Sequence, residues 1–129
     1  MQNTFIIFQL YSMSNKYTGT KGEEMAAAYL VKNGYNIVER NWRFKHLEVD
    51  IIASRGNCMH FFEIKTRTSD MYGHPEESIS RKKMTNLKNA AEEYQYLHPE
   101  WKYVQFNVLA IKMYFNQPVE IMLFEDVYF

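Results

Sequence analysis

The chain has little of what marks disulfide-rich, low-complexity or highly charged proteins. It contains one cysteine, Cys58, which excludes an internal disulfide and is compatible with a reducing cytosol. Its 15 basic and 15 acidic residues give a net charge of zero, so any basic patch must be local. The sequence has no phosphate-binding glycine loop, dinucleotide fingerprint or nucleophile elbow. Apolar residues make up 47% of the 129 positions, which predicts one folded domain and argues against disorder.

Long apolar runs are also missing, and no stretch reaches the length needed to cross a membrane. The apolar segment at residues 5–11 lacks a basic leader and a small-residue cleavage site, so we expect no signal peptide and predict a cytoplasmic protein. Met13 begins a polar segment typical of a protein start. Residues 1–13 are therefore interpreted as an N-terminal extension: an extra strand, a flexible tail or the product of a wrongly chosen start codon. Residues 14–129 are expected to form the domain.

The periodicity of apolar residues and the positions of turn residues predict an α/β fold. Thr20 and Glu23 fit a capping box that begins a helix, and Gly34 is placed to end it. A second helix is expected over residues 80–97, and strands over residues 35–44, 47–54, 58–66, 103–113 and 119–124. The order α-β-β-β-α-β-β indicates a mixed β-sheet flanked by helices.

The Gly-Asn dipeptide at residues 56–57, between two apolar runs, predicts a β-hairpin. Residues equally far from the turn face one another in a hairpin, so Asp50 is expected opposite Glu63, and Glu48 opposite Lys65. Because side chains alternate along a strand, all four would project from one face.

Two facing carboxylates destabilise a sheet unless their charge is compensated. The flanking residues are strongly apolar, which indicates a buried strand pair where an unpaired charge is costly. A hard divalent cation between Asp50 and Glu63, with Lys65 acting on a water, would form a centre suited to phosphodiester cleavage. The alternative is a solvated strand face with a cross-strand salt bridge. Glu48 either neutralises Lys65 or is an outer metal ligand.

Basic residues gather at the start of the second helix and near the hairpin. They are Arg81, Lys82, Lys83, Lys88, Arg67 and Arg43. A solvated helix face would explain the first four. Cations at a helix N-terminus oppose the helix dipole, however, and this favours a nearby anion such as the phosphate of a nucleic-acid backbone.

Several segments together resemble the YraN-like family of bacterial proteins. They are GEEMAA at residues 22–27, RNWR at 40–43, EVDIIA at 48–53, FEIKTR at 62–67 and YGHP at 72–75, with Lys83, Leu87, Ala90, Ala91 and Tyr94 completing the pattern. The resemblance covers about residues 14–113. That family is similar to the restriction-endonuclease-like superfamily, whose signature is Asp followed by (Asp/Glu)-x-Lys, and the arrangement looks closest to archaeal Holliday-junction resolvases.

The resemblance implies a restriction-endonuclease-like core with a metal centre. It implies Asp50, Glu63 and the backbone carbonyl of Ile64 as ligands of Mg²⁺ or Mn²⁺, and Lys65 as the catalytic lysine. Archaeal Holliday-junction resolvases also carry a glutamate on the first helix, so Glu23 becomes a further acidic residue of the site, in addition to its interpretation as a helix cap.

The resemblance also implies an activity. We expect a metal-dependent nuclease acting on structured DNA such as junctions or flaps, with Lys83 as a phosphate contact and a homodimer as the assembly. The alternative is a catalytically silent module that binds nucleic acid or a protein partner. The related strand usually has the sequence Phe-Asp-Val, and Asn107 stands here in place of the aspartate. If that aspartate tunes the centre, Asn107 favours the silent alternative.

Overall fold

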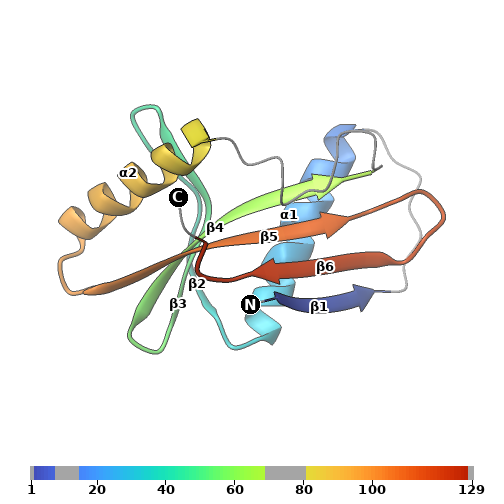
Figure 1. Ribbon diagram of the computed structural model, residues 1–129, viewed down its shortest axis with the longest axis horizontal. Helices are drawn as coiled ribbons and strands as arrows, with labels where there is room; N and C mark the ends of the chain where they lie inside the picture. Colours follow the sequence, from blue (N-terminus) through green and yellow to red (C-terminus); the bar gives the residue numbers. More distant parts are fainter. Residues whose placement is uncertain (1, 8–14, 69–80, 128–129) are drawn as a thin grey trace.

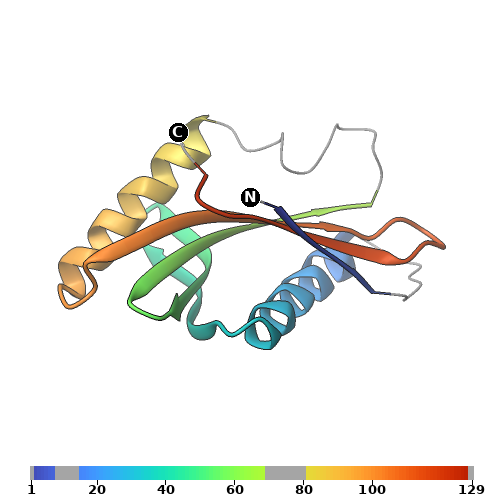
Figure 2. The same ribbon diagram turned by 60° about the horizontal axis from the view of Figure 1, so that its bottom comes forward.

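A six-stranded mixed β-sheet carries one helix on each face (Figures 1 and 2). The computed structural model describes residues 2–7, 15–68 and 81–127, with side chains from residue 21 onward. The elements are β1 (Gln2–Ile7), α1 (Asn15–Lys32), β2 (Asn36–Phe44), β3 (Leu47–Arg55), β4 (Cys58–Arg67), α2 (Arg81–Leu97), β5 (Tyr103–Lys112) and β6 (Val119–Phe124). In Figure 2, α2 lies above the sheet and α1 below it.

The strand order across the sheet is β1-β6-β5-β4-β3-β2. Only β4 and β5 run parallel, and the segment between them contains α2 as a crossover helix. The other neighbours are antiparallel. Both faces of β4 are therefore covered, which is why its first half is an uninterrupted buried run from Met59 to Phe62.

Each helix encloses its own apolar core against the sheet. The core under α1 includes Leu30, Phe62 and Leu109, and the core under α2 includes Phe61 and Tyr94. The two adjacent residues Phe61 and Phe62 thus point to opposite faces, as the alternation of a strand requires. Burying a large apolar side chain stabilises the fold by about 1.5–3 kcal/mol, so both cores contribute substantially.

The predicted order α-β-β-β-α-β-β is confirmed, and the predicted strand boundaries agree with the structure to within one residue. An additional strand, β1, precedes this order and pairs antiparallel with β6, from Gln2 opposite Phe124 to Ile7 opposite Val119. Of the three interpretations of residues 1–13, the structure shows the extra strand for residues 2–7; residues 8–14 lie outside the described part. The interpretation of the whole segment as an extension to the domain stays a prediction.

The predicted start of the first helix is wrong. Helix α1 begins at Asn15, so Thr20 lies inside the helix and cannot be the non-helical cap that a capping box requires. The end of the helix was predicted correctly. Gly34 has a φ of 87°, and the amides of Gly34 and Tyr35 donate to the carbonyls of Val31 and Leu30, which is a Schellman motif.

Neither helix is long and apolar enough to cross a membrane, as far as the described ranges extend. The YGHP motif at residues 72–75 lies outside those ranges.

Candidate metal centre

The hairpin of β3 and β4 has the register that the sequence predicted, from the turn as far as Ile51 and Phe62. Gly56 supplies a φ of 61° in the turn, and the pairs run from Arg55 opposite Cys58 to Ile51 opposite Phe62. The ladder then ends, although both strands continue. The predicted pairing of Asp50 with Glu63 is therefore not formed, and we call this unpaired interval between β3 and β4 the gap.

The side chain of Asp50 fills this gap. The backbone amide of Ile64 donates a hydrogen bond of 2.8 Å to Oδ2 of Asp50. In a continued ladder the same amide would face the backbone carbonyl of Val49. The carboxylate of Asp50 therefore replaces a backbone acceptor and is held against β4, between Glu63 and Lys65.

The face of the sheet to which alternate side chains of β3 point also changes at Asp50. Val49 packs in the core under α2, whereas Ile51, two residues later, packs in the core under α1. In a regular strand these two residues would share a face. On the neighbouring strand, Asn41 has a φ of 53°, so the irregularity extends to β2. The backbone distortion is thus centred on the residue that the sequence singled out as a metal ligand.

Asp50 lies in an environment that disfavours its charge. Its pKa is raised to about 7, chiefly by burial and then by the negative charge of Glu63, with a smaller contribution from Glu23. The Ile64 amide and the ammonium of Lys83 oppose this shift. A bound cation would favour the charged form of Asp50, because it would compensate the negative charges of the two carboxylates directly.

Glu63 is held between two lysines. Its Oε1 lies 2.5 Å from Nζ of Lys83, on the first turn of α2, and 4.0 Å from Nζ of Lys65, on its own strand. The side chains of Glu63 and Lys65 are only 12% and 15% exposed, whereas that of Lys83 is 50% exposed. Glu63 and Lys65 are thus fixed parts of the centre, and Lys83 reaches it from the solvent side.

The two lysines have opposite pKa shifts. Burial and the charge of Lys83 lower the pKa of Lys65, with Glu63 opposing them. Burial also lowers the pKa of Lys83, but its hydrogen bond and charge interaction with Glu63 outweigh this effect, and its pKa is raised overall. A lysine with a lowered pKa beside a carboxylate is suited to proton transfer or to orienting a water.

Glu23 approaches the centre from α1. It is partly buried and its charge acts on Asp50, whereas the neighbouring Glu24 is exposed. Gly22 permits the approach, because a Cβ atom at this position would lie 2.3 Å from Oγ1 of Thr66 on β4. This placement agrees with Glu23, and not Glu24, as the further acidic residue of the site. Because the capping box is not formed, Glu23 is not part of a helix cap.

Glu48 is placed differently from the expectation. The β3–β4 ladder does not extend to Glu48 and Lys65, so the predicted pair is not formed. Glu48 is paired with Arg43 of β2 instead, with 3.5 Å between Arg43 Nη2 and Glu48 Oε2 and side chains that are 73% and 58% exposed. This contact is an exposed salt bridge to the edge strand β2. Neither Arg43 nor Glu48 therefore lies in the immediate centre.

The remaining basic residues lie on α2 and at the end of β4. Arg81, Lys82 and Lys88 are exposed on α2. Arg81 and Lys88 line a surface hollow of about 540 Å³ together with Thr85, Asn89 and Glu92. Arg67, at the end of β4, donates to the carbonyl of Thr66, and within the described ranges its Nε is a buried donor without an acceptor.

Residues 22–111 match the protein family described as uncharacterised protein family UPF0102. The chain belongs to this family. A UPF0102 protein of Chlorobium phaeobacteroides is 39% identical over 108 residues, covering 83% of this chain and 85% of the relative. A UPF0102 protein of Caldicellulosiruptor saccharolyticus is 39% identical over 110 residues, covering 85% of this chain and 92% of the relative. The resemblance to the YraN-like family is thus confirmed.

The matched segment of UPF0102 contains the whole centre, from Gly22 and Glu23 on α1 to Lys83 on α2. It ends within β5 and leaves out β1 and β6. The family match therefore covers the strands and helices that bring the acidic and basic residues together.

The donor set of the centre fits Mg²⁺ better than a metal held in an all-protein cage. Within residues 2–7, 15–68 and 81–127, no group of three or more His, Cys, Asp or Glu side chains could hold a metal ion. Mg²⁺ is commonly bound through one or two carboxylates with water and substrate phosphate as the other ligands. Asp50 and Glu63, with the Ile64 carbonyl, match that pattern, whereas a structural zinc site would need four protein ligands.

Asn107 belongs to a different part of the molecule. It lies beside Phe62 in the β4–β5 ladder, and residues of this parity on β5, such as Leu109, pack in the core under α1. Glu63 points to the other face, toward α2 and Lys83. The idea that residue 107 tunes the acidic pair is therefore not supported by its position, and Asn107 does not argue against activity.

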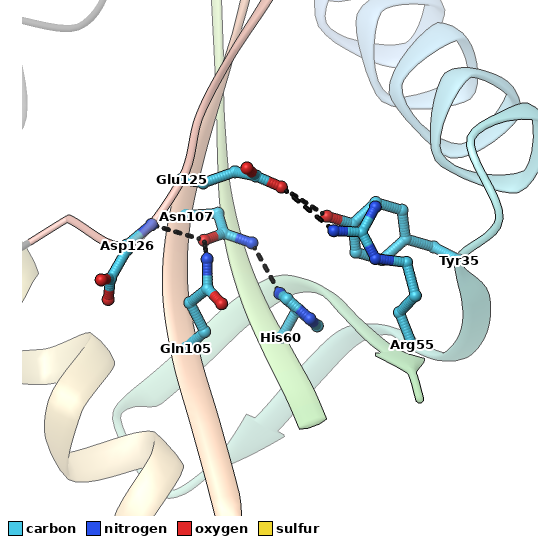
Figure 3. A network of polar contacts seen from close by, with 7 residues as sticks. All are labelled: Tyr35, Arg55, His60, Gln105, Asn107, Glu125 and Asp126. Carbon is cyan, nitrogen blue, oxygen red and sulfur yellow. Dashed lines mark hydrogen bonds and ion pairs between the residues drawn. The ribbon is translucent and has the colours of Figure 1, made fainter. Parts of the chain in front are cut away.

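Asn107 instead joins a buried polar network that sequence reasoning missed (Figure 3). Its Oδ1 accepts hydrogen bonds of 3.0 Å from the backbone amide of Asp126 and 3.1 Å from Nε2 of Gln105. The amide nitrogen of Asn107 must then face Nδ1 of His60, at 2.9 Å. Nδ1 consequently accepts, and His60 is neutral with its proton on Nε2. Burial lowers the pKa of His60, in agreement with the neutral ring.

A second part of the network lies at the rim. The hydroxyl of Tyr35 donates to Oε1 of Glu125 at 3.0 Å, and Arg55 lies 3.3 Å from the same oxygen (Figure 3). The Arg55 guanidinium also stacks over the Tyr35 ring. These contacts fix the segment that follows β6. A histidine and an asparagine, each between apolar neighbours in its strand, were the sign of this network in the sequence.

Proposed function

We propose that this protein is a Mg²⁺-dependent nuclease that hydrolyses phosphodiester bonds in branched or otherwise structured DNA. The observation that supports it most is the acidic pair in the gap between β3 and β4. Asp50 is fixed there by the Ile64 amide, beside Glu63 and its two lysines. A sheet built only for stability would not place two carboxylates together in a half-buried position.

Each residue of the centre has a role in this proposal. Asp50, Glu63 and the Ile64 carbonyl would hold the metal, which supplies charge for the scissile phosphate and a lower pKa for a bound water. Lys65 orients the attacking water and stabilises the negative charge that develops on the phosphate. Glu23 adds a further acidic group from α1 that can hold a water or a proton at the rim of the centre.

The surroundings of the centre are suited to a polyanionic strand. Helix α2 packs on the face of the sheet to which Glu63 points, and its exposed basic residues can neutralise phosphates of a bound strand. Because the net charge is zero, this positive surface is local, which favours a defined site over general DNA binding. Symmetric cutting of a junction would require a homodimer, with one centre for each strand.

The experiment is a cleavage assay on end-labelled four-way junction, flap and linear duplex DNA, with Mg²⁺, Mn²⁺ or EDTA. Cleavage of the branched substrates with metal is expected, and it should fall on the order of 100-fold in Glu63→Gln and in Lys65→Met, because each removes a group that acts in the transition state. Glu48→Gln is the matched control, since its exposed salt bridge lies outside the centre. Equal cleavage by all preparations would indicate a contaminating nuclease and contradict the proposal.

A silent binding module on the same fold is the second candidate. It is favoured by the small number of protein ligands in the described centre. Salt-dependent binding of the junction without cleavage under any metal condition would select this candidate. Failure to bind or cut any DNA would exclude both the nuclease and a module that binds nucleic acid.

A further inference from the structure

The contact between Lys83 and Glu63 raises a question that the nuclease proposal leaves open. Oε1 of Glu63, 2.5 Å from Nζ of Lys83, is an oxygen of the carboxylate that would hold the metal. An ammonium group and a divalent cation on one carboxylate repel each other strongly at close range in a half-buried site. Metal binding therefore favours a Lys83 side chain that lies farther from Glu63.

The structure favours movement of Lys83 over movement of Lys65. Lys65 is on the strand itself, its side chain is 15% exposed, and its Nζ is already 4.0 Å from the carboxylate oxygen. Lys83 reaches across from the first turn of α2, and half of its side chain is exposed to solvent. A flexible lysine stem at the solvent side of the centre can turn outward at little conformational cost.

The position to which Lys83 would turn is also indicated. Arg81 and Lys82 precede Lys83 on the first turn of α2 and are exposed, so the outward direction leads to a positively charged surface at the start of the helix. A lysine that turns to this surface adds a positive charge to it, and an anionic partner would stabilise that charge. A nucleic-acid phosphate provides that partner, at the end of a helix whose free amides also favour anions.

We propose that Lys83 is an exchangeable counter-ion of the centre, which neutralises Glu63 in the metal-free protein and turns to a phosphate of the nucleic acid when a divalent cation binds. This inference rests on the proposed function and deepens it. It makes metal and nucleic acid bind with positive coupling, because the cation releases a lysine that the nucleic acid then uses. Lys83 would therefore contact the DNA in the metal-loaded protein but not in the metal-free protein.

Two binding measurements test the exchange, and neither depends on cleavage. The first is calorimetric titration of Mn²⁺ into the wild-type protein, Lys83→Met and the control Lys82→Met. Loss of the competing ammonium is expected to tighten Mn²⁺ binding roughly tenfold in Lys83→Met. Lys82 is exposed and its charge is screened, so Lys82→Met should change the affinity by less than about threefold.

The second measurement is the salt dependence of four-way junction binding, followed by fluorescence anisotropy in EDTA and in Ca²⁺. In Ca²⁺, Lys83→Met is expected to reduce the magnitude of the slope of log K against log salt by about 1, the loss of one phosphate contact. In EDTA the slope should not change, because Lys83 is then engaged with Glu63. Lys88→Met should reduce the slope about equally in both conditions, since Lys88 is exposed on the same helix.

The outcomes separate this inference from the proposed function. Unchanged or weaker Mn²⁺ binding by Lys83→Met, or an equal change of slope in EDTA and Ca²⁺, would overturn the exchange while leaving the nuclease proposal intact. If the wild-type protein binds no Mn²⁺, the metal-dependent function itself fails. Should Lys83→Met not fold, Lys83→Gln keeps a neutral donor to Glu63 and carries the same expectations for Mn²⁺.

Discussion

Replacement of Asp50 by asparagine is expected to stabilise the metal-free protein. Burial and the charge of Glu63 raise the pKa of Asp50 from its usual 3.8 to about 7 in the folded state. The asparagine removes that charge and keeps an oxygen that can accept the Ile64 amide, which donates to Asp50 at 2.8 Å. A substitution that stabilises the fold while removing a metal ligand is typical of a functional residue placed at a cost to stability.

The magnitude follows from the shift. A pKa that rises by about 3 units corresponds to about 4 kcal/mol at a pH above the folded pKa, since each unit is about 1.4 kcal/mol. The asparagine side chain is still a buried polar group and keeps part of the cost of burial, so we expect roughly half of this, about 2 kcal/mol, in Asp50→Asn. For a domain of this size that is an increase in Tm of about 8 °C.

The direction in which the stability of the wild-type protein changes with pH follows from the same raised pKa. Because the folded pKa is raised, the folded protein holds this proton more tightly than the unfolded chain does. The wild-type protein therefore loses stability as the pH rises from about 4 to about 7, and the loss persists above pH 7. The gain in Asp50→Asn should be small at pH 4 and largest at pH 8.

The assay is urea unfolding followed by tryptophan fluorescence, at pH 5 and pH 8, in EDTA and in Mg²⁺. Saturating Mg²⁺ should stabilise the wild-type protein and have little effect on Asp50→Asn, because binding to the folded state alone shifts the unfolding equilibrium. The control Glu48→Gln, on the same strand, should change the free energy of unfolding by less than about 0.5 kcal/mol. A lower stability of Asp50→Asn at pH 8 in EDTA would refute the reasoning, since the charge would then be favourable where it lies.

Two further substitutions test the approach of α1 to the centre and the buried polar network around Asn107. Gly22→Ala should cost about 1–3 kcal/mol in urea unfolding, because its Cβ would clash with Thr66 Oγ1, and adding Thr66→Ala should recover part of the loss; additive effects would contradict the close approach. Asn107→Asp should raise the pKa of His60 in an NMR titration, because a carboxylate beside Nδ1 favours the imidazolium. Burial holds the pKa of wild-type His60 below its usual value, so the wild-type protein should lose stability as the pH falls below about 6.5, and Asn107→Asp should lose less; an unchanged pKa would contradict the assigned network.

Much of the fold could be predicted from local patterns. The hairpin register followed from one Gly-Asn turn, and Gly56 does adopt a positive φ there. The start of α1 could not be predicted in the same way. Thr20 and Glu23 fit a cap locally, but α1 begins at Asn15 and continues through Gly22, where the missing side chain permits contact with Thr66.

The candidate centre could be predicted in its residues but not in its geometry. Asp50, Glu63 and Lys65 were identified from spacing and charge. The pairing of Glu48 with Lys65 was not realised, because regular alternation was extended past the point where β3 leaves β4. A break in a ladder depends on how both strands pack against the helices, and no local pattern near Asp50 indicates it.

The sequence by itself determined most of the elements, the hairpin register near the turn and the family, because turn residues, alternation and short motifs act over a few positions of the chain. Only the tertiary structure decided which polar residues meet. It placed Lys83, twenty positions after Glu63 in the chain, on that carboxylate, and it placed Asn107 beside His60 on the opposite face of the sheet. The physical reason is that α2 and α1 pack on different faces, so the face that a strand residue occupies determines its partners.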